Sequence, residues 1–122
     1  VSIKFNRDNG DAINLKKIEN LKLIYESGLE KFLENEFPGC TIILFGSYAR
    51  GEDVWFGMMD GRDSDIDIAI VGTKGRDIDL DKFERIFERE IILNFYKSWK
   101  DIHKYLKNNI LNGIILAGSV DL

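Results

Sequence analysis

The spacing of apolar residues divides this chain into alternating helical and strand-like segments. Apolar side chains recur at three- and four-residue steps from about Asn14 to Leu33, which predicts a helix that ends before Pro38. Residues 41–45 and 66–71 are continuous apolar runs bounded by turn residues, as expected of buried strands. The expected buried positions of the long helix are Leu15, Ile18, Leu21, Ile24, Tyr25, Leu29, Phe32 and Leu33.

The C-terminal half of the chain continues this alternation. It predicts a helix that begins at Asp81, a strand over residues 90–96 and a second helix over residues 99–109. Residues 113–117 form a last apolar segment, which is either a strand or a helix end. The alternation in residues 1–9 suggests a short strand or an arm. The expected inward positions of the last helix are Ile102, Tyr105, Leu106 and Ile110.

This order of helices and strands predicts an α/β (α+β) fold, with a mixed sheet of about three to five strands flanked by helices. A chain of 122 residues forms one domain and can bury a real core. We expect residues 14–122 to form this domain and residues 1–13 to be an N-terminal arm or linker strand. Because the sequence begins at Val1 without a methionine, we expect a processed chain or a fragment, with a DNA-binding module as one candidate upstream domain.

The composition narrows the classes of function. The content of 44% hydrophobic and 31% charged residues is that of an ordinary globular protein. The net charge of −4 disfavours nucleic acid as the main partner of this domain. The single cysteine, Cys40, excludes an internal disulfide and fits a reducing compartment. Since the sequence contains no signal-peptide pattern and no long apolar run, we expect a cytoplasmic protein without membrane contact.

Two aspartates at the entry to the second predicted strand are candidates for a metal site. Asp65 and Asp67 are separated by one residue, so both side chains project from the same face of a strand. Two carboxylates so close together repel each other unless a cation lies between them. Magnesium prefers oxygen ligands of this kind, supplemented by substrate phosphates.

The end of the first predicted strand suggests a phosphate site. Gly46-Ser47 follows the apolar run directly and leads into a short helical turn over residues 47–51. Backbone N–H groups at a strand-to-helix turn bind anions. Together with the aspartate pair, this turn predicts a site for a phosphorylated substrate and a divalent cation.

The order Gly46-Ser47, Arg50-Gly51, then Ser64-Asp65-Ile66-Asp67 resembles the signature of the DNA polymerase beta-type nucleotidyltransferase superfamily. The short length is similar to that of the minimal nucleotidyltransferases, which include antitoxin partners of HEPN toxins. The resemblance covers residues 41–71 by motif and the rest by the order of elements alone.

The resemblance implies a role for each matched residue. Gly46 and Ser47 would contact the triphosphate of ATP or another nucleoside triphosphate, and Arg50 would support it, unless Arg50 forms only a surface ion pair. Asp65 and Asp67 would bridge two Mg²⁺ ions as the catalytic residues. Ser64 is a further nucleotide-binding candidate, with a turn residue as its alternative.

The strand over residues 90–96 departs from the family pattern, because active members carry a third carboxylate there. In its place the sequence offers Asn94, a neutral and weaker metal ligand, or Glu90, which lies at the strand's start or at the preceding helix end. We therefore expect nucleotide and magnesium binding more firmly than turnover.

Other polar clusters have plainer interpretations. Asp77 and Asp79 precede a helix, which favours a capping role. The apolar segment over residues 52–63 either packs on the sheet edge or forms a partner-binding flap. His103 has no companion ligand. Four lysines at helical spacing suggest a stripe on the last helix, either a solvated face or a site for an acidic partner or a nucleic-acid phosphate: Lys97, Lys100, Lys104 and Lys107.

These observations support two functions. The first is Mg²⁺-dependent transfer of a nucleoside monophosphate, AMP from ATP, to a hydroxyl of a protein or a small molecule. A cognate toxin is one such protein partner, and a homodimer is a second partner to consider. The alternative is a catalytically weak nucleotide-binding antitoxin or regulatory module.

Overall fold

The sheet of this protein has four strands in the order β3-β2-β1-β4. The computed structural model describes residues 2–52 and 64–120, with side chains from residue 10 onward. β1 runs antiparallel to β2 and β4, whereas β2 and β3 are parallel, so the sheet is mixed and the predicted fold class is confirmed. The strands are β1 (Thr41–Phe45), β2 (Ile66–Val71), β3 (Ile91–Tyr96) and β4 (Ile114–Ala117).

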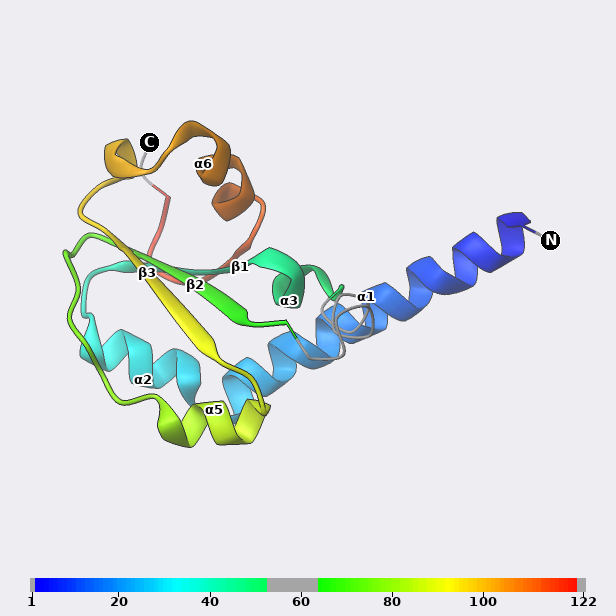
Figure 1. The fold of residues 1–122 in the computed structure, drawn as a ribbon, viewed down its shortest axis with the longest axis horizontal. Coiled ribbons are helices and arrows are strands. Elements are labelled where there is room, and N and C mark those ends of the chain that lie inside the picture. Colours follow the sequence, from blue (N-terminus) through cyan, green and yellow to red (C-terminus); the bar gives the residue numbers. More distant parts are fainter. Residues whose placement is uncertain (1, 53–63, 121–122) are drawn as a thin grey trace.

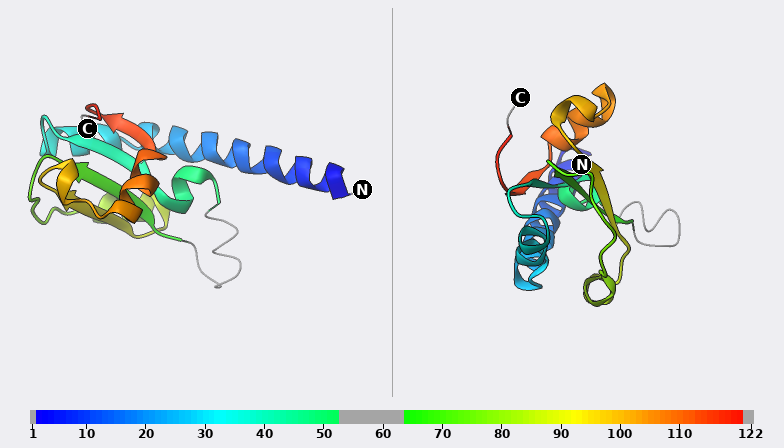
Figure 2. Two further views of the ribbon diagram at one scale, coloured as in Figure 1. Left: turned by 90° about the horizontal axis from the view of Figure 1, so that it is seen from above. Right: turned by 90° about the vertical axis from the view of Figure 1, so that its left-hand side faces the viewer.

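Helices cover both faces of the sheet (Figures 1 and 2). One face carries α2 and α5 together with the C-terminal half of α1, and the other carries the 3-10 turn η1 and α6. The short helix α3 follows β1 directly at one end of the sheet. The helices are α1 (Ser2–Glu26), α2 (Leu29–Glu36), α3 (Gly46–Arg50), α5 (Asp81–Phe87), η1 (Trp99–Asp101) and α6 (Lys104–Leu111).

The continuous apolar run of β1 follows from its place in the middle of this arrangement. Ile42 and Leu44 pack into the core beneath α2 and α5, whereas Ile43 and Phe45 pack into the core beneath α6. Every residue of β1 is buried because successive side chains enter opposite cores. The strand therefore fixes the position of Gly46, the residue that follows it.

Of the two alternatives for residues 1–9, a strand or an arm, the strand is wrong, because α1 begins at Ser2. Alternation over so few residues carries less weight than the extension of an existing helix, which adds one hydrogen bond per residue. The helix continues through Asn14, the expected cap, and ends before Gly28, whose φ of 86° is left-handed. The division of the chain after residue 13 stays a prediction, although α1 crosses it without a break.

The exposed apolar residues of α1 also differ from the prediction. Leu15 and Ile18 are 63% and 64% exposed, and Tyr25 is also exposed, whereas Ile24 is buried. The N-terminal part of α1 extends away from the sheet (Figure 1), so its helical spacing of apolar residues has no core to face. Contact with the domain begins near Ile13, whose carbonyl lies beside Gly51 at the end of α3.

The predicted helix over residues 99–109 is two elements, η1 and α6, separated at Ile102 and His103. The His103 ring accepts a hydrogen bond from the backbone N–H of Tyr105 at 3.4 Å, which starts α6 anew. Ile102 and Ile110 are buried as predicted, but Tyr105 is 77% exposed. The break also separates the predicted lysine stripe, since only Lys104 and Lys107 lie on α6.

Two further predictions are resolved. Residues 114–117 form a strand, β4, at the edge of the sheet beside β1. α5 begins at Asp81 as predicted, but the Glu84 carboxylate accepts the Ile91 N–H at 2.8 Å and so ties α5 to β3. Within the described residues, no helix has both the length and the apolar character needed to cross a membrane.

Candidate functional site

The turn after β1 and the start of β2 are in direct contact. Phe45 pairs with Asp67 in the sheet, which places Gly46 beside the Asp67 side chain. A Cβ atom at Gly46 would lie 2.7 Å from Asp67 Oδ2, and the φ of Gly46 is 81°. Only glycine allows this backbone conformation and this approach without strain. The carboxylate of Asp67 is therefore seated directly on the turn.

A second contact connects the same two segments. The Ser47 hydroxyl donates a hydrogen bond to the Ser64 hydroxyl at 2.9 Å. The guanidinium of Arg89 donates to the Ser64 carbonyl at 3.1 Å and stacks over the Tyr48 ring at 5.4 Å. These contacts hold Ser64, the residue that precedes Asp65, in place. Arg89, which the sequence analysis did not single out, holds this segment from the far side.

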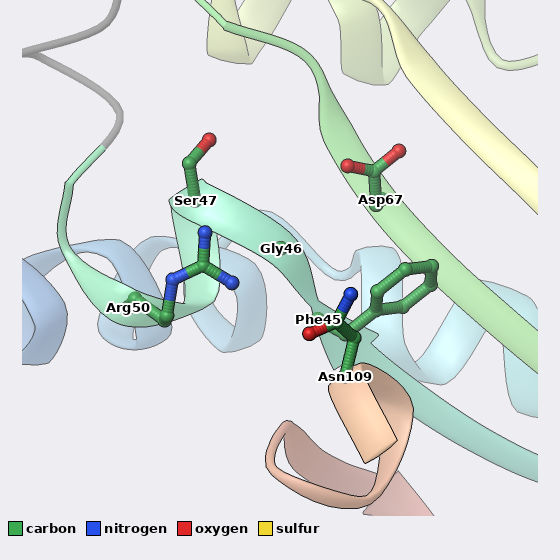
Figure 3. A pocket seen from close by; sticks show the side chains of 6 residues that line it. All are labelled: Phe45, Gly46, Ser47, Arg50, Asp67 and Asn109. Atoms are coloured by element: carbon green, nitrogen blue, oxygen red, sulfur yellow. The ribbon is translucent and has the colours of Figure 1, made fainter. Parts of the chain in front are cut away.

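Gly46, Ser47 and Asp67 border a cavity of about 320 Å³ at the end of β1. Ser47 and Arg50 approach it from α3, Asp67 from β2 and Asn109 from α6 (Figure 3). The structure therefore brings Gly46, Ser47, Arg50 and Asp67 together, as predicted. Asn109 is an addition, because its place depends on how α6 packs over the sheet and has no local sequence signal.

The groups around this cavity have opposing effects on the pKa of Asp67. Burial raises the pKa of Asp67 above its ordinary value, the neighbouring Asp65 carboxylate raises it further, and Arg50 lowers it. Arg50 also forms a 3.0 Å ion pair with Glu52 in which both side chains are exposed, so the surface ion pair foreseen as its alternative exists as well. The aspartate pair is close enough to repel, which is the condition that favours a bound cation.

The family follows from a comparison with known proteins. A family model described as a nucleotidyltransferase domain matches residues 26–117. The chain belongs to this family. No curated protein and no solved structure matches the chain. Membership supports nucleotidyl transfer in general and a nucleoside triphosphate as substrate.

The register of β3 shows what this nucleotidyltransferase domain lacks beside its aspartates. Ile92 is the partner of Asp67 across the parallel pair, and Asn94 is the partner of Ala69. Asn94 therefore lies two residues farther along the strand, about 7 Å away from the level of Asp67. Its amide donates a 3.4 Å hydrogen bond to the Ile68 carbonyl, and it does not border the cavity.

A third carboxylate does not join the pair from elsewhere in the described chain. Glu90 is exposed, and its carbonyl accepts the Ile66 N–H at 2.9 Å, so it lies just ahead of β3. Across residues 2–52 and 64–120, no three His, Cys, Asp or Glu side chains gather closely enough to hold one ion. The position that would complete the aspartate pair by register is occupied by the aliphatic side chain of Ile92.

The remaining candidates of the sequence are placed elsewhere. Asp79 Oδ1 accepts the Asp81 N–H at 3.0 Å ahead of α5, which confirms its capping role. The Cys40 thiol is buried, and burial raises its pKa. The flap hypothesis for residues 52–63 falls almost wholly outside the described residues.

Proposed function

We propose that this domain transfers AMP from ATP to a hydroxyl group of a protein or a small molecule in a Mg²⁺-dependent reaction. The observation that supports this proposal most is the Asp67 carboxylate seated on Gly46, with Ser47 and Arg50 beside the same cavity. A phosphate bound at this turn would be repelled by the Asp67 carboxylate unless a cation lay between them, because like charges repel.

The donor set fits magnesium. Asp67 supplies carboxylate oxygens from β2 and Asp65 supplies them from the position just before this strand, and burial together with the repulsion by Asp65 raises the pKa of Asp67. These two residues would hold the ion together with phosphate oxygens of the substrate. When bound, magnesium supplies activation of the acceptor hydroxyl and neutralisation of the leaving pyrophosphate. A second ion would have fewer protein ligands, since Ile92 adjoins Asp67.

The other residues of the cavity position the substrate. The first N–H groups of a helix have no partner within the helix, so those of the turn at Gly46 and Ser47 can donate to phosphate oxygens. The Arg50 guanidinium adds positive charge at the mouth of the same cavity. Asn109, on the opposite wall, offers an amide to the nucleoside or to the acceptor.

One observation favours a second function, that of a nucleotide-binding antitoxin or regulatory module with weak catalysis. Ile92 stands where a third carboxylate would complete the site. An aliphatic side chain can neither bind a metal nor accept a proton from the acceptor. Binding of ATP and magnesium needs only the residues that are present at the cavity, whereas fast transfer needs a general base or a stronger metal site.

An experiment that follows the α-phosphate of ATP distinguishes the two functions. The protein is incubated with Mg²⁺, its genomic neighbour and ATP labelled either at the α- or at the γ-phosphate. Nucleotidyl transfer leaves α-label, and no γ-label, on the acceptor and releases pyrophosphate. The Asp65→Asn, Asp67→Asn double variant should lose the label, whereas the matched Asp77→Asn, Asp79→Asn control should keep it.

Each outcome has a distinct meaning. Inhibition of the partner that survives the Asp65→Asn, Asp67→Asn change, without label on the partner, would establish the binding module. Label from the γ-phosphate would refute nucleotidyl transfer. Failure of ATP and Mg²⁺ to bind at about 1 mM, measured by calorimetry, would refute both functions.

A further inference from the structure

A second cavity of about 490 Å³ lies at the opposite end of the sheet from the aspartates. Its lysines come from three segments: Lys97 from the end of β3, Lys100 from η1 and Lys107 from α6. The break at Ile102 and His103 makes this convergence possible, because it folds η1 and α6 over the same sheet end. Three of the lysines that were predicted to form a stripe on one helix therefore line this cavity from several sides. We refer to the cavity as the hollow.

Among the described residues, the charged side chains that line this hollow are all positive. None of the three forms an ion pair with a carboxylate of residues 10–52 or 64–120. No Asp or Glu borders the cavity, and Asp101, the nearest acidic residue in sequence, lies close to the Ser98 hydroxyl at 3.5 Å. A chain whose net charge is −4 therefore concentrates positive charge at one place. Such a concentration attracts anions.

The rest of the wall suits phosphate oxygens. Ser98 and Ser119 add hydroxyl groups to the wall, although the Ser98 hydroxyl also donates to the Asp101 carboxylate at 3.5 Å. The Thr41 hydroxyl is already used in a 2.7 Å hydrogen bond to the Ser119 carbonyl. The buried Trp99 forms part of the floor. Several ammonium and hydroxyl donors around one concave space can bind a compact ligand with several acceptor oxygens. The size lies within the range of small-molecule sites.

The shape favours a compact anion over a nucleic-acid strand. A strand needs basic residues that follow its backbone over some distance, yet Lys104 does not border this cavity and the three lysines that do face one hollow. We propose that this cavity binds a ligand with two or more linked phosphates, such as an inorganic oligophosphate or the phosphate tail of a nucleotide. The site is separate from the aspartates, since β1 places Thr41 at one cavity and Phe45 at the other, about 13 Å apart.

This proposal does not depend on the proposed catalytic function, and its test avoids the aspartate site. Binding of tripolyphosphate to the full chain is measured by calorimetry at low ionic strength in the presence of EDTA. Without a divalent cation the aspartate pair repels phosphates, so saturable binding at one equivalent reports the lysine cavity. We expect Lys97→Gln and Lys107→Gln each to weaken binding about tenfold, the loss typical of a charge-assisted hydrogen bond.

Matched variants decide whether the loss of tripolyphosphate affinity is specific to the lysines of the cavity. Lys104→Gln removes the same charge from the exposed surface of α6 and should change the affinity less than about twofold. Lys97→Arg should retain most of the affinity. Pyrophosphate and ADP are compared next: equal affinity identifies the phosphates alone as the ligand, whereas tighter binding of ADP identifies a nucleotide.

Four results would overturn the proposal. One is the absence of saturable tripolyphosphate binding at about 1 mM. Another is an equal loss in Lys104→Gln and Lys107→Gln, which would indicate general charge attraction. The third is a loss on Arg50→Gln with none on Lys107→Gln, which would place the anion in the other cavity. Binding of a single-stranded oligonucleotide that depends on Lys104 as strongly as on Lys107 would instead assign the surface to nucleic acid.

Discussion

The two ends of the sheet carry different charged side chains and are built in different ways: one cavity is lined by both an aspartate and an arginine, the other by lysines. At the carboxylate end, Gly46 directly follows β1 and Asp67 lies on β2, the antiparallel neighbour of β1, and the whole site except Asn109 lies within about twenty residues of sequence. At the lysine end, Lys97, Lys100 and Lys107 come from separate elements that a helix break brings together. A site made by neighbouring strands is visible as a motif, whereas one made by distant elements is not.

The largest effect that would test this contrast is the loss of Asp67. Asp67→Asn should lower nucleotidyl transfer at least about 100-fold, because it removes a carboxylate that would hold the metal at the reacting phosphate. The same variant should bind tripolyphosphate in EDTA as the wild type does. Label transfer and calorimetry on one preparation measure both. If both activities disappear together, the two ends are not independent.

Glycine substitution at each end gives the next largest effect. Gly46→Ala and Gly72→Ala both introduce a side chain at positive φ, 81° and 119°, which costs about 1–2 kcal/mol of unfolding free energy. Only at Gly46 does the new Cβ overlap a functional atom, 2.7 Å from Asp67 Oδ2, whereas at Gly72 the nearest atom is 3.5 Å away. Denaturant titration should therefore show losses in both variants.

The two glycine variants should differ in ligand binding. Gly46→Ala displaces the Asp67 carboxylate and should weaken binding of ATP with Mg²⁺, which Gly72→Ala should leave intact. Calorimetry with ATP and Mg²⁺ measures this difference. Equal affinities in the two variants would show that Asp67 does not need its place on the turn.

Asn109 should contribute a smaller effect at the carboxylate end. Asn109→Ala removes an amide from the cavity wall and should reduce the affinity for ATP or the rate of transfer about fivefold, the value of one neutral hydrogen bond. Asn108→Ala, on the exposed surface of the same helix, is the matched control. A similar loss in both variants would point to α6 as a whole instead of the Asn109 amide.

The smallest expected effect is on stability as a function of pH. Because the folded state raises the pKa of Asp67, its proton is held more tightly when the protein is folded than when it is unfolded. This contribution to stability is fully present at acid pH, below the unfolded pKa, and is lost as the pH rises through the folded pKa. Asp67→Asn, which stays neutral, should therefore become more stable relative to the wild type above about pH 4.

Thermal unfolding of both proteins across this pH range measures the difference. Added Mg²⁺ should remove it by stabilising the wild type alone, since a ligand that binds only the folded state raises its stability. A stability difference that does not change with pH would mean that folding does not raise the pKa of Asp67.

Local sequence patterns sufficed for much of the sheet. The runs of β1 and β2 were predicted because both faces of these strands are buried, so every position is apolar. The turn at Gly46-Ser47 and the pair Asp65 and Asp67 were predicted as parts of one site, because a turn and an alternating strand follow directly from neighbouring residues. The capping role of Asp79 is equally local.

Other features depended on contacts between distant segments. Periodicity could not show that α1 exposes Leu15 and Ile18, since spacing does not say whether a core lies opposite. Nor could it show the break at His103, which competes with a helix through a single side-chain hydrogen bond. Arg89, which braces Ser64, was missed because its contact spans 25 residues of sequence.

The sequence alone thus determined the carboxylate end, because a strand, a turn and the next strand place its residues through local geometry. Tertiary structure decided whether that end is complete, since the register of β3 puts Ile92 beside Asp67 and Asn94 beyond it. It also decided that Lys97, Lys100 and Lys107 share a cavity. Register and helix packing come from the fit of whole faces against one another, and no short segment carries that information.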